Sequence, residues 1–473
     1  MKGLSTEAAR AKIVHMFETA PAPEGELQPL HAVDVRCGAE RLATLGAGSG
    51  AGADEGELVD QIAALEHLKR AASAAQARVT AAFAASRVAA AEAAGVPRDR
   101  RSRGVAEMVA LARGESPHRG GRHLGLATAL VAEMPNTLAA LAGGAIDEWA
   151  ATLLVRESAV LSAPERSVLD ARIAPLLAAP GTGTARLARA AHGIVCELDP
   201  AAVAARASKA AAERRVSIRP APDTMTYLTA LLPVAEGVAV YAALDGAART
   251  AAAAGDPRGR GQVMADTLTG RCTGLATGEP VQVAVQLVMT DTTLLGGGPG
   301  AATVHAAGGV HGPVPAPLAR ALVVAAADRD AAWVRRLYTA PRTGALVAVE
   351  SRHRRFPPGL RQLITLRDQT CATPWCDAPI RHVDHITAHT DGGPTTATNA
   401  QGLCEHCNLV KQTPGWATTG TAGRTTITTP TGHTYPGTSP PALTAPPQSA
   451  PGDPDPSPLE RALRHHLDLH LAA

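Results

Sequence analysis

One stretch, from Cys371 to Lys411, limits most strongly what this chain can fold into, because it holds two close pairs of cysteines. Cys371 and Cys376 form the first pair, and Cys404 and Cys407 form the second. Each pair can present both sulfurs in one direction, so the two pairs can supply the four ligands of a tetrahedral zinc ion. With sulfur in all four positions the ion would be structural, and it would hold together a unit too small to have much core of its own. Four free thiols would leave the paired spacing without a reason.

Acid–base groups lie between and just after the cysteine pairs. Asp384 and His385 are adjacent in a predicted strand, so both can reach one centre only at a strand end or a distorted turn. Asp384 offers a hard oxygen ligand to a divalent cation such as Mg²⁺ or Mn²⁺, and His385 can deprotonate water near neutral pH. Asn408, on a helix predicted to begin near Glu405, offers a second oxygen. These groups predict a site for metal-assisted hydrolysis of a phosphodiester.

Arginine accumulates around this site in a chain that is almost neutral. The formal net charge is +2 at pH 7, so any contact with DNA has to come from a local patch. Residues 351–381 contain six arginines and two aspartates. This local excess predicts binding to the phosphate backbone. The candidate contacts are Arg354, Arg355, Arg361, Arg367, Arg381 and Lys411.

The length of 473 residues predicts more than one domain, because single cores stop growing near ~250–300 residues. Hydrophobic residues make up 45% of the chain and aromatic residues only 2%, so alanine fills most of the apolar share and favours closely packed helices. We predict a mainly α N-terminal region with a small α+β part, followed by a small C-terminal domain. The expected boundaries are a flexible segment over 1–55, a mainly helical domain with a few strands over 56–350, a zinc-containing domain over 351–436, a Pro-rich linker over 437–458 and a helix over 459–473.

A second candidate for DNA contact lies inside the helical region. The Arg-rich segment PRDRRSRG precedes a short predicted helix, and Ser116 can cap a new helix that has Pro117 at its first position. This helix–turn–helix outline suggests a DNA-reading element. The alternative is a solvated turn in a helical domain, since runs of charge usually face water.

The rest of the sequence bears on location. The N-terminal residues lack the apolar run and cleavage site of a signal peptide, and no uninterrupted apolar stretch reaches the ~18 residues of a membrane span. Paired cysteines suit metal binding in a reducing compartment better than disulfides. We therefore expect a cytoplasmic protein with no membrane partner.

The motif around the cysteines resembles a known family. The run Cys-x4-Cys, His-x-Asp-His, Gly-Gly-Pro-Thr, Asn and Leu-Cys-x2-Cys-Asn-x2-Lys resembles the zinc-containing HNH endonucleases, which have the ββα-metal fold. Over about residues 60–436, the chain resembles bacterial proteins that join an N-terminal helical domain of unknown function, DUF222, to a C-terminal HNH nuclease. Stretches such as MPNTLAALAGGAIDEWAATL and RRFPPGLRQL carry this wider resemblance.

The resemblance implies a role for each site residue. His385 would be the general base, Asp384 and Asn408 would be ligands of the catalytic metal, and Asn399 would brace the loop that aims the base. The four cysteines would bind structural zinc. The last position of the motif is often histidine, whereas this chain has Asn408, which can still coordinate a cation through oxygen. The helical domain brings no established chemistry.

Two functions follow as expectations. The first is a metal-dependent endonuclease that hydrolyses DNA phosphodiester bonds. The second is a non-catalytic DNA-binding or scaffold protein that retains a zinc-braced HNH shell, a hypothesis motivated by the missing histidine at position 408. DNA is the expected partner in both. A homodimer is also possible, because a single-site nuclease often needs two copies to cut both strands.

Overall fold

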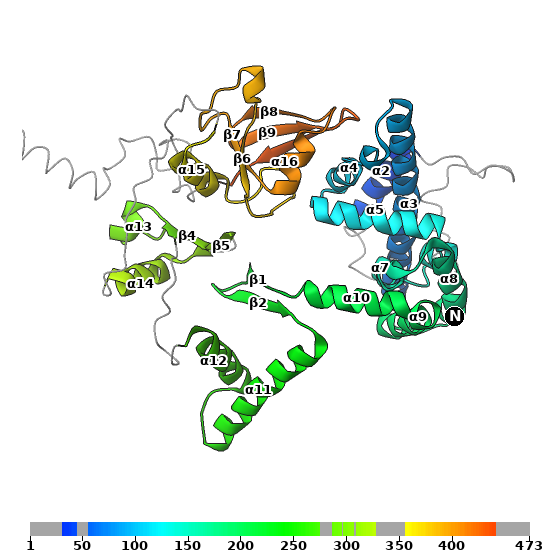
Figure 1. Cartoon of the computed structure of the whole chain (residues 1–473), viewed down its shortest axis with the longest axis horizontal. Helices are drawn as coiled ribbons and strands as arrows, with labels where there is room; N and C mark the ends of the chain where they lie inside the picture. The colour runs from blue at the N-terminus through cyan, green and yellow to red at the C-terminus, as the bar shows by residue number, and fades with distance from the viewer. Residues whose placement is uncertain are drawn as a thin grey trace, which may run out of the picture. The chain divides into compact units, whose positions relative to one another are not determined.

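The structure is a computed structural model, and it describes residues 31–44, 55–274, 286–295, 297–306, 309–327 and 355–440. The chain splits into two compact units, one made of Met1–Arg101 with Arg122–Ala205 and the other of Ser102–Gly121 with Arg206–Ala473. Helices dominate the N-terminal half, and small sheets come later in the chain (Figure 1). This distribution confirms the predicted class of a mainly α region followed by a small C-terminal α+β domain.

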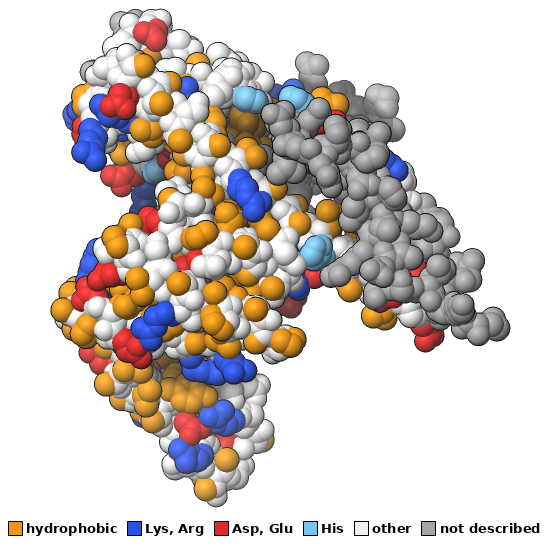
Figure 2. All heavy atoms as spheres, turned by 90° about the vertical axis from the view of Figure 1, so that its right-hand side faces the viewer, with side chains coloured by type: hydrophobic (Ala, Val, Ile, Leu, Met, Phe, Trp, Pro, Cys, Tyr) orange, Lys and Arg blue, Asp and Glu red, His pale blue; other side chains and the backbone are white. Residues whose placement is uncertain are grey.

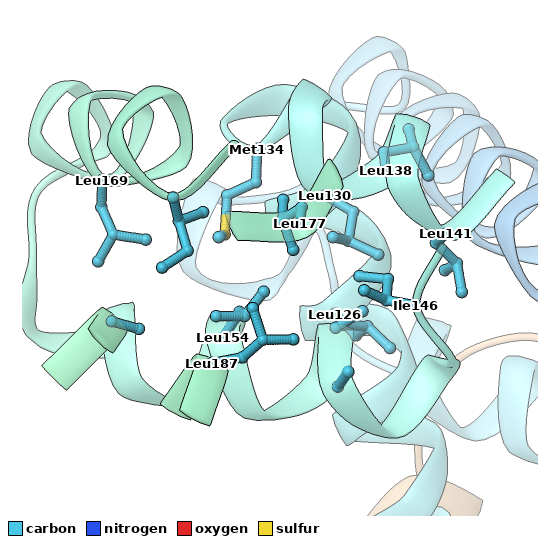
Figure 3. Close-up of a cluster of buried hydrophobic side chains, with 14 of the residues drawn as sticks. Leu126, Leu130, Met134, Leu138, Leu141, Ile146, Leu154, Leu169, Leu177 and Leu187 are labelled. Carbon is cyan, nitrogen blue, oxygen red and sulfur yellow. The ribbon is translucent and has the colours of Figure 1, made fainter. Parts of the chain in front are cut away.

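The first unit is a packed set of helices. Its core is a continuous cluster of buried leucine, isoleucine, valine, alanine and methionine side chains, in which Leu130, Met134 and Leu154 are fully buried (Figure 3). The elements are α2 (Ala32–Ala43), α3 (Glu55–Ala93), η1 (Arg98–Arg100), α5 (Pro117–Ala132), α6 (Pro135–Ala142), α7 (Glu148–Glu157), η2 (Ser158–Val160), α8 (Ala163–Ala178), α9 (Thr184–Leu198) and α10 (Pro200–Ala212). Helix α5 begins in the second unit and continues into the first, and α10 runs from the first unit into the second.

The spacing of the apolar residues from Leu58 onward predicts a helix from about Glu57 to about Ala94, and α3 forms there, but its first turns are not buried as that pattern suggests. Leu58, Ile62 and Leu65 share one face by their spacing, and all three remain exposed. The buried residues of α3 are Ala74 and Ala77, further along the helix, which join the core cluster. Small side chains therefore make the close helix contacts here, as the alanine-rich composition suggested.

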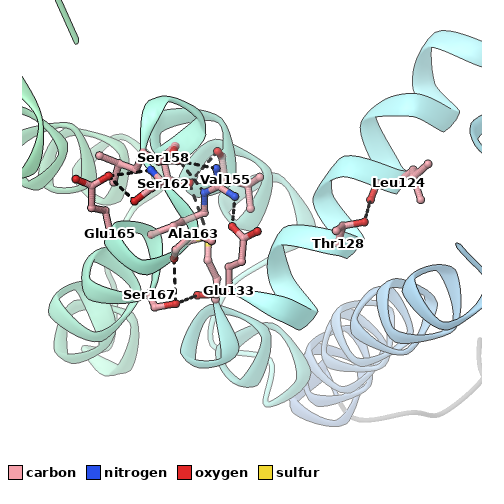
Figure 4. Close-up of polar contacts among 12 residues, drawn as sticks. Leu124, Thr128, Glu133, Val155, Ser158, Ser162, Ala163, Glu165 and Ser167 are labelled. Carbon is pink, nitrogen blue, oxygen red and sulfur yellow. Dashed lines mark hydrogen bonds and ion pairs between the residues drawn. The ribbon is translucent and has the colours of Figure 1, made fainter. Parts of the chain in front are cut away.

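Polar groups fix the helix ends within this unit. Ser162 and Glu165 form a capping box at the start of α8, with Glu165 Oε2 accepting a hydrogen bond from Ser162 N at 2.8 Å (Figure 4). The Ser167 hydroxyl donates to the backbone oxygen of Glu133 at 3.0 Å, which ties α8 to the end of α5. These contacts satisfy backbone groups that a helix leaves without a partner at its ends.

A buried carboxylate holds the start of α6. Asp170 on α8 is fully buried, and its two oxygens accept hydrogen bonds from the backbone nitrogens of Asn136 and Thr137 at 2.7 and 2.9 Å. The side chains of the same two residues donate to it as well, at 3.0 and 2.6 Å. All four donors would lose their partner together if the carboxylate were removed.

We therefore expect Asp170→Ala to destabilise the helical unit by about 3 kcal/mol, because it leaves buried donors unpaired. The matched control is Asp199→Ala at the start of α10, where the carboxylate accepts one backbone hydrogen bond, from Ala202 at 2.8 Å. Loss of that cap should cost about 1 kcal/mol. Urea unfolding of the full chain followed by far-UV circular dichroism compares the two. Equal shifts for both variants would contradict the structural role of Asp170.

The first part of the second unit combines short sheets and helices. After α4 (Val105–Arg113) and the start of α5, it contains the antiparallel hairpin β1 (Arg215–Pro220) and β2 (Thr226–Leu231). Helices α11 (Val234–Ala253) and α12 (Arg260–Thr273) pack together. A three-stranded sheet has the order β3 (Gln286–Val288), β4 (Ala302–Ala306), β5 (Gly309–Val314). In the sequence, α13 (Asp291–Leu295) lies between β3 and β4, and α14 (Ala316–Ala327) follows β5.

Several sequence predictions fall wholly or partly outside the described residues. The β-branched, alternating run VQVAVQLVMT (281–290) predicts a strand, and the described residues contain it as Gln286–Val288. The run LYTAPRTGALVAVESR predicts a hairpin with its turn at 341–344, and it lies outside the described ranges. So do Arg354, most of the Pro-rich linker and the C-terminal helix.

The second unit also contains a small α+β domain after Phe356. Helix α15 (Pro358–Asp368) precedes the antiparallel pair β6 (His382–His385) and β7 (Ala400–Leu403), in which His385 lies opposite Ala400. A 3₁₀ turn, η3 (His389–Asp391), lies between these strands, and α16 (Glu405–Lys411) follows β7. Strands β8 (Ala417–Thr421), β9 (Arg424–Thr428) and β10 (Thr434–Thr438) form an antiparallel sheet in which β9 is central. Strand–strand–helix is the order that the predicted ββα-metal fold requires.

A buried ion pair fixes α15 to β7. Arg367 and Asp368 are both buried, with Arg367 Nε 2.7 Å from Asp368 Oδ1. The guanidinium also donates to the backbone oxygens of Ala397 and Ala400, at 2.5 and 2.7 Å, while Asp368 Oδ2 accepts from Gly402 N at 2.7 Å. Every charge in this network has partners, which is the condition under which buried charges are tolerated.

No single helix in the described ranges is long and apolar enough to cross a membrane, although the bent pair formed by α5 and α6 passes that test jointly. On the face drawn in Figure 2, basic and acidic side chains are scattered among many apolar ones. That mixture agrees with the net charge of +2.

Candidate functional site

The candidate site lies where β6 ends. Asp384 and His385 are the last two residues of this strand, so their side chains leave the backbone on opposite sides. Asp384 faces α16, where its Oδ2 lies 2.7 Å from Lys411 Nζ. His385 is buried on the other side, with its ring 4.5 Å from the ring of Phe356. The pair thus lies at the end of β6, which is shorter than the strand that the run HVDHITAH predicts.

A threonine that sequence reasoning did not single out fixes the imidazole. His385 Nε2 lies 2.9 Å from the hydroxyl oxygen of Thr395, and both residues are buried. A hydrogen bond to one ring nitrogen sets the tautomer and the orientation of a histidine. Thr395 belongs to the Gly-Gly-Pro-Thr segment of the motif, and this position was the only signal that could have pointed to it.

Asn399 crosses the loop that joins β6 to β7. Its Oδ1 accepts from Thr387 N at 2.9 Å, and its Nδ2 donates to the backbone oxygens of Thr387 and Pro394 at 3.0 and 2.9 Å. Its own backbone oxygen accepts from Ile386 N at 2.8 Å. These hydrogen bonds hold Thr387 and Pro394, which lie close to His385 and Thr395 in the sequence, on either side of Asn399. This geometry suits the bracing role that the sequence assigned to Asn399.

Asn408 and Lys411 lie one turn apart on α16 and face β6. Asn408 Nδ2 lies 3.1 Å from His382 Nδ1. Its Oδ1 is buried and makes no hydrogen bond within the described part of the chain, so a carbonyl oxygen remains available beside the strand that carries Asp384. A buried oxygen without a partner is costly, and a cation would satisfy it. Asp384 and Asn408 thus have the chemistry of a hard-cation site.

Lys411 already neutralises Asp384. Its side chain is 13% exposed, and Nζ contacts both the Asp384 carboxylate and the backbone oxygen of His385. The sequence predicted that Lys411 contacts the DNA backbone. The structure instead places it within the site.

The four cysteines form one cluster. Their sulfurs lie within 4.8 Å of one another, with Cys376 Sγ 3.8 Å from Cys404 Sγ and 3.7 Å from Cys407 Sγ. A tetrahedral ion with metal–sulfur bonds of about 2.3 Å separates its sulfur ligands by about 3.8 Å. Hydrogen bonds from Cys371, Cys376 and Cys407 hold the pKa of the Cys404 thiol well below its usual range. The cluster can hold a metal ion, and the second cysteine pair begins α16.

The arginines that were predicted to bind the phosphate backbone of DNA separate into two groups. Arg355, Arg361 and Arg381 are exposed, and none of them has an ion-pair partner among the described residues, so they can meet a phosphate. Arg367 was predicted to do the same, and that prediction is wrong because its guanidinium is buried and bonded to Asp368 and two carbonyl oxygens. Arg354 lies outside the described residues.

Comparison with known proteins adds the family. A model of the domain of unknown function DUF222 matches residues 59–368, and a model of the HNH endonucleases matches residues 369–413. No curated protein and no solved structure matches the chain. The HNH match covers β6, β7 and α16 with the cysteine cluster and supports a nuclease-type domain. Because the first match spans more than half of the sequence, this chain belongs to the DUF222 family and carries a C-terminal HNH endonuclease domain.

Proposed function

We propose that this chain is a metal-dependent endonuclease that hydrolyses DNA phosphodiester bonds at the end of β6. The observation that carries the proposal is the buried, unpartnered Oδ1 of Asn408 beside the strand that carries Asp384 and His385, inside a segment that matches the HNH family. A carboxylate and an amide oxygen can bind a divalent cation, and an imidazole can act as the base in metal-assisted hydrolysis of a phosphodiester.

Each residue has one task in this proposal. The His385 imidazole takes a proton from the attacking water, and Thr395 and Asn399 keep the ring and its loop in place. Asp384 and Asn408 would hold Mg²⁺ or Mn²⁺, which when bound screens the charge that develops on the phosphate. The exposed Arg355, Arg361 and Arg381 bind the backbone on either side of the cut.

We further propose zinc for the cysteine cluster. Four thiolates at the observed sulfur separations satisfy its tetrahedral preference and leave no open position, so its role is structural. It fixes the start of α16, and Asn408 and Lys411 follow on the same short helix.

The ion pair between Lys411 and Asp384 favours the second candidate, a DNA-binding or scaffold protein that keeps an HNH shell without cutting. In that case the ammonium group takes the place of a metal as the partner of the carboxylate. DNA binding without any cleavage would support this function over the first.

The deciding experiment is cleavage of supercoiled plasmid by the purified full chain with Mg²⁺, with Mn²⁺ and without added divalent metal, with zinc content measured on the same sample. The endonuclease proposal expects nicked or linear product that depends on the added metal. Equal background in all three conditions, on a sample that contains its zinc, would overturn it.

Thr395 offers a sharper test of how the base is positioned. We expect Thr395→Val, which keeps the shape but removes the hydroxyl, to lower kcat by about 10- to 100-fold, the usual cost of losing a group that orients a functional histidine. Thr395→Ser keeps the hydroxyl and should restore most of the activity. Single-turnover plasmid nicking at saturating enzyme measures the step, and a filter-binding assay checks that DNA affinity is unchanged. An equally large loss in the serine variant would point to packing and contradict the orienting role.

A further inference from the structure

Helices α4 and α5 form a tight helix–turn–helix pair. α4 ends at Arg113 and is followed by Gly114, whose φ of 65° lies in the left-handed region that glycine adopts at little cost, and α5 begins at Pro117. A Cβ on Gly120 would lie only 2.5 Å from the Cβ of Ala110, so the two helices meet closely at this point. A short turn that contains glycine is typical of helix–turn–helix units.

Helix α4 is held on the small C-terminal domain, within the same unit. Glu107 is buried on α4, and its carboxylate oxygen lies 2.6 Å from Nε2 of His406 on α16. Ala110 and Leu111 line a cavity together with Cys407 and other residues of that domain. α4 is mostly buried by these contacts and cannot enter a DNA groove. In a helix–turn–helix unit, the first helix is not the one that reads the bases.

Helix α5, in contrast, exposes a basic face near its start. His118, Arg119 and Arg122 are exposed and fall on one face by their spacing. Neither arginine pairs with a carboxylate within the described ranges, and the sixteen residues of α5 include no acidic side chain. Leu126 and Leu130, further along the helix, are buried in the helical core and hold its other side. The charge of this exposed face is complementary to DNA.

We propose that α4 and α5 are a helix–turn–helix unit that presents the exposed face of α5 to the major groove of duplex DNA, where Arg119 and Arg122 contact base edges. The major groove is about 12 Å wide and admits an α-helix, and arginine binds guanine there through two hydrogen bonds. Arg103, which is exposed just before α4, contacts the phosphate backbone.

This proposal rests on the proposed function for its substrate, DNA, and adds a source of sequence preference. The exposed arginines of the HNH domain meet phosphates, which carry no direct sequence information. A reading helix attached through α4 to the domain that carries α16 would let the nuclease prefer some DNA sites over others.

The test is selection of bound duplexes from a library with a randomised central region, using the full chain without added divalent metal, followed by fluorescence anisotropy on the selected duplex. We expect an enriched sequence, and a loss of about tenfold or more in affinity for it in the variant with both Arg119→Ala and Arg122→Ala. The variant with both arginines replaced by lysine should keep binding to unselected DNA and lose the preference, because lysine retains charge without the two-pronged contact.

Arg186 and Arg189 on α9 provide the matched control, because they are exposed and have the same spacing near the start of their helix. Their double alanine variant should select the same sequence with unchanged affinity. No enriched sequence from the wild type would overturn the proposal. So would unchanged selection by the Arg119/Arg122 variants, or an equal loss in the α9 control. The selection measures binding and not cleavage, so its outcome can be interpreted even if the nuclease proposal fails. His385→Ala should therefore select the same sequence as the wild type.

Discussion

Replacing His385 with alanine is expected to lower DNA cleavage by about 10²- to 10⁴-fold, the range that general acid–base groups contribute to catalysis. The reason is local. His385 is the imidazole that the end of β6, Thr395 and the Asn399-braced loop hold in one orientation. No other described histidine has this set of contacts. Plasmid nicking under single-turnover conditions with Mn²⁺ measures the effect directly.

A matched control distinguishes the loss of the proposed general base from the effect of removing any histidine. His433 is exposed near the turn between β9 and β10, so His433→Ala should leave cleavage within about twofold of the wild type. Affinity for DNA should be unchanged in both variants. Because His385 is buried beside Phe356, the thermal stability of His385→Ala has to be compared as well. Cleavage by a folded His385→Ala variant at the wild-type rate would remove this residue from the mechanism.

The local parts of the site could be predicted from the sequence. The helix that begins near Glu405 follows from a pattern within a few residues, and the structure confirms it; of the strand predicted over HVDHITAH, only His382–His385 forms. The cysteine spacing likewise predicted that four sulfurs would meet. Each of these features depends on short stretches of chain, where spacing alone decides which side chains can face one another.

The parts that failed depend on contacts between distant residues. Arg367 looked like a phosphate contact because a run of charge normally faces water, but Asp368 and two carbonyl oxygens give its guanidinium a complete set of buried partners. The contact between Glu107 and His406 joins residues almost 300 positions apart, which no local pattern reports. Thr395 is one threonine among many, and only the path of the loop brings its hydroxyl to His385.

The contact between Glu107 and His406 changes how the domains relate. The DUF222 match includes residues 102–121, yet this segment packs in the same compact unit as the HNH domain. Glu107 touches α16 one residue before Cys407, so the helical region contacts the element that presents Asn408. The two family matches therefore describe sequence segments that the fold does not keep apart.

The second large effect is expected from the cysteine cluster. The core next to it consists of Cys371, Leu403, Cys404 and Cys407, so most of its buried side chains are the proposed ligands themselves. Structural zinc contributes roughly 10–16 kcal/mol of apparent binding free energy in zinc-finger peptides, more than such a small core can replace. We expect Cys407→Ser to lose zinc and to unfold residues 369–413, and with them any cleavage.

Hydrogen exchange read by mass spectrometry, with zinc measured by elemental analysis, tests this expectation in the full chain. Protection of β6, β7 and α16 should be lost in Cys407→Ser, while the core helices of the first unit, which hold no part of the cluster, keep theirs. Cys272→Ser is the control, because that thiol is exposed on α12 and should change neither zinc content nor protection. Helix α4 tests the contact between the two family matches. Its contacts with α16 should disappear when zinc is lost, so the amides of Val105–Arg113 should exchange faster, although this helix belongs to the DUF222 match. Unchanged zinc content and protection in Cys407→Ser would show that the cluster holds no structural metal and that packing alone maintains the HNH domain.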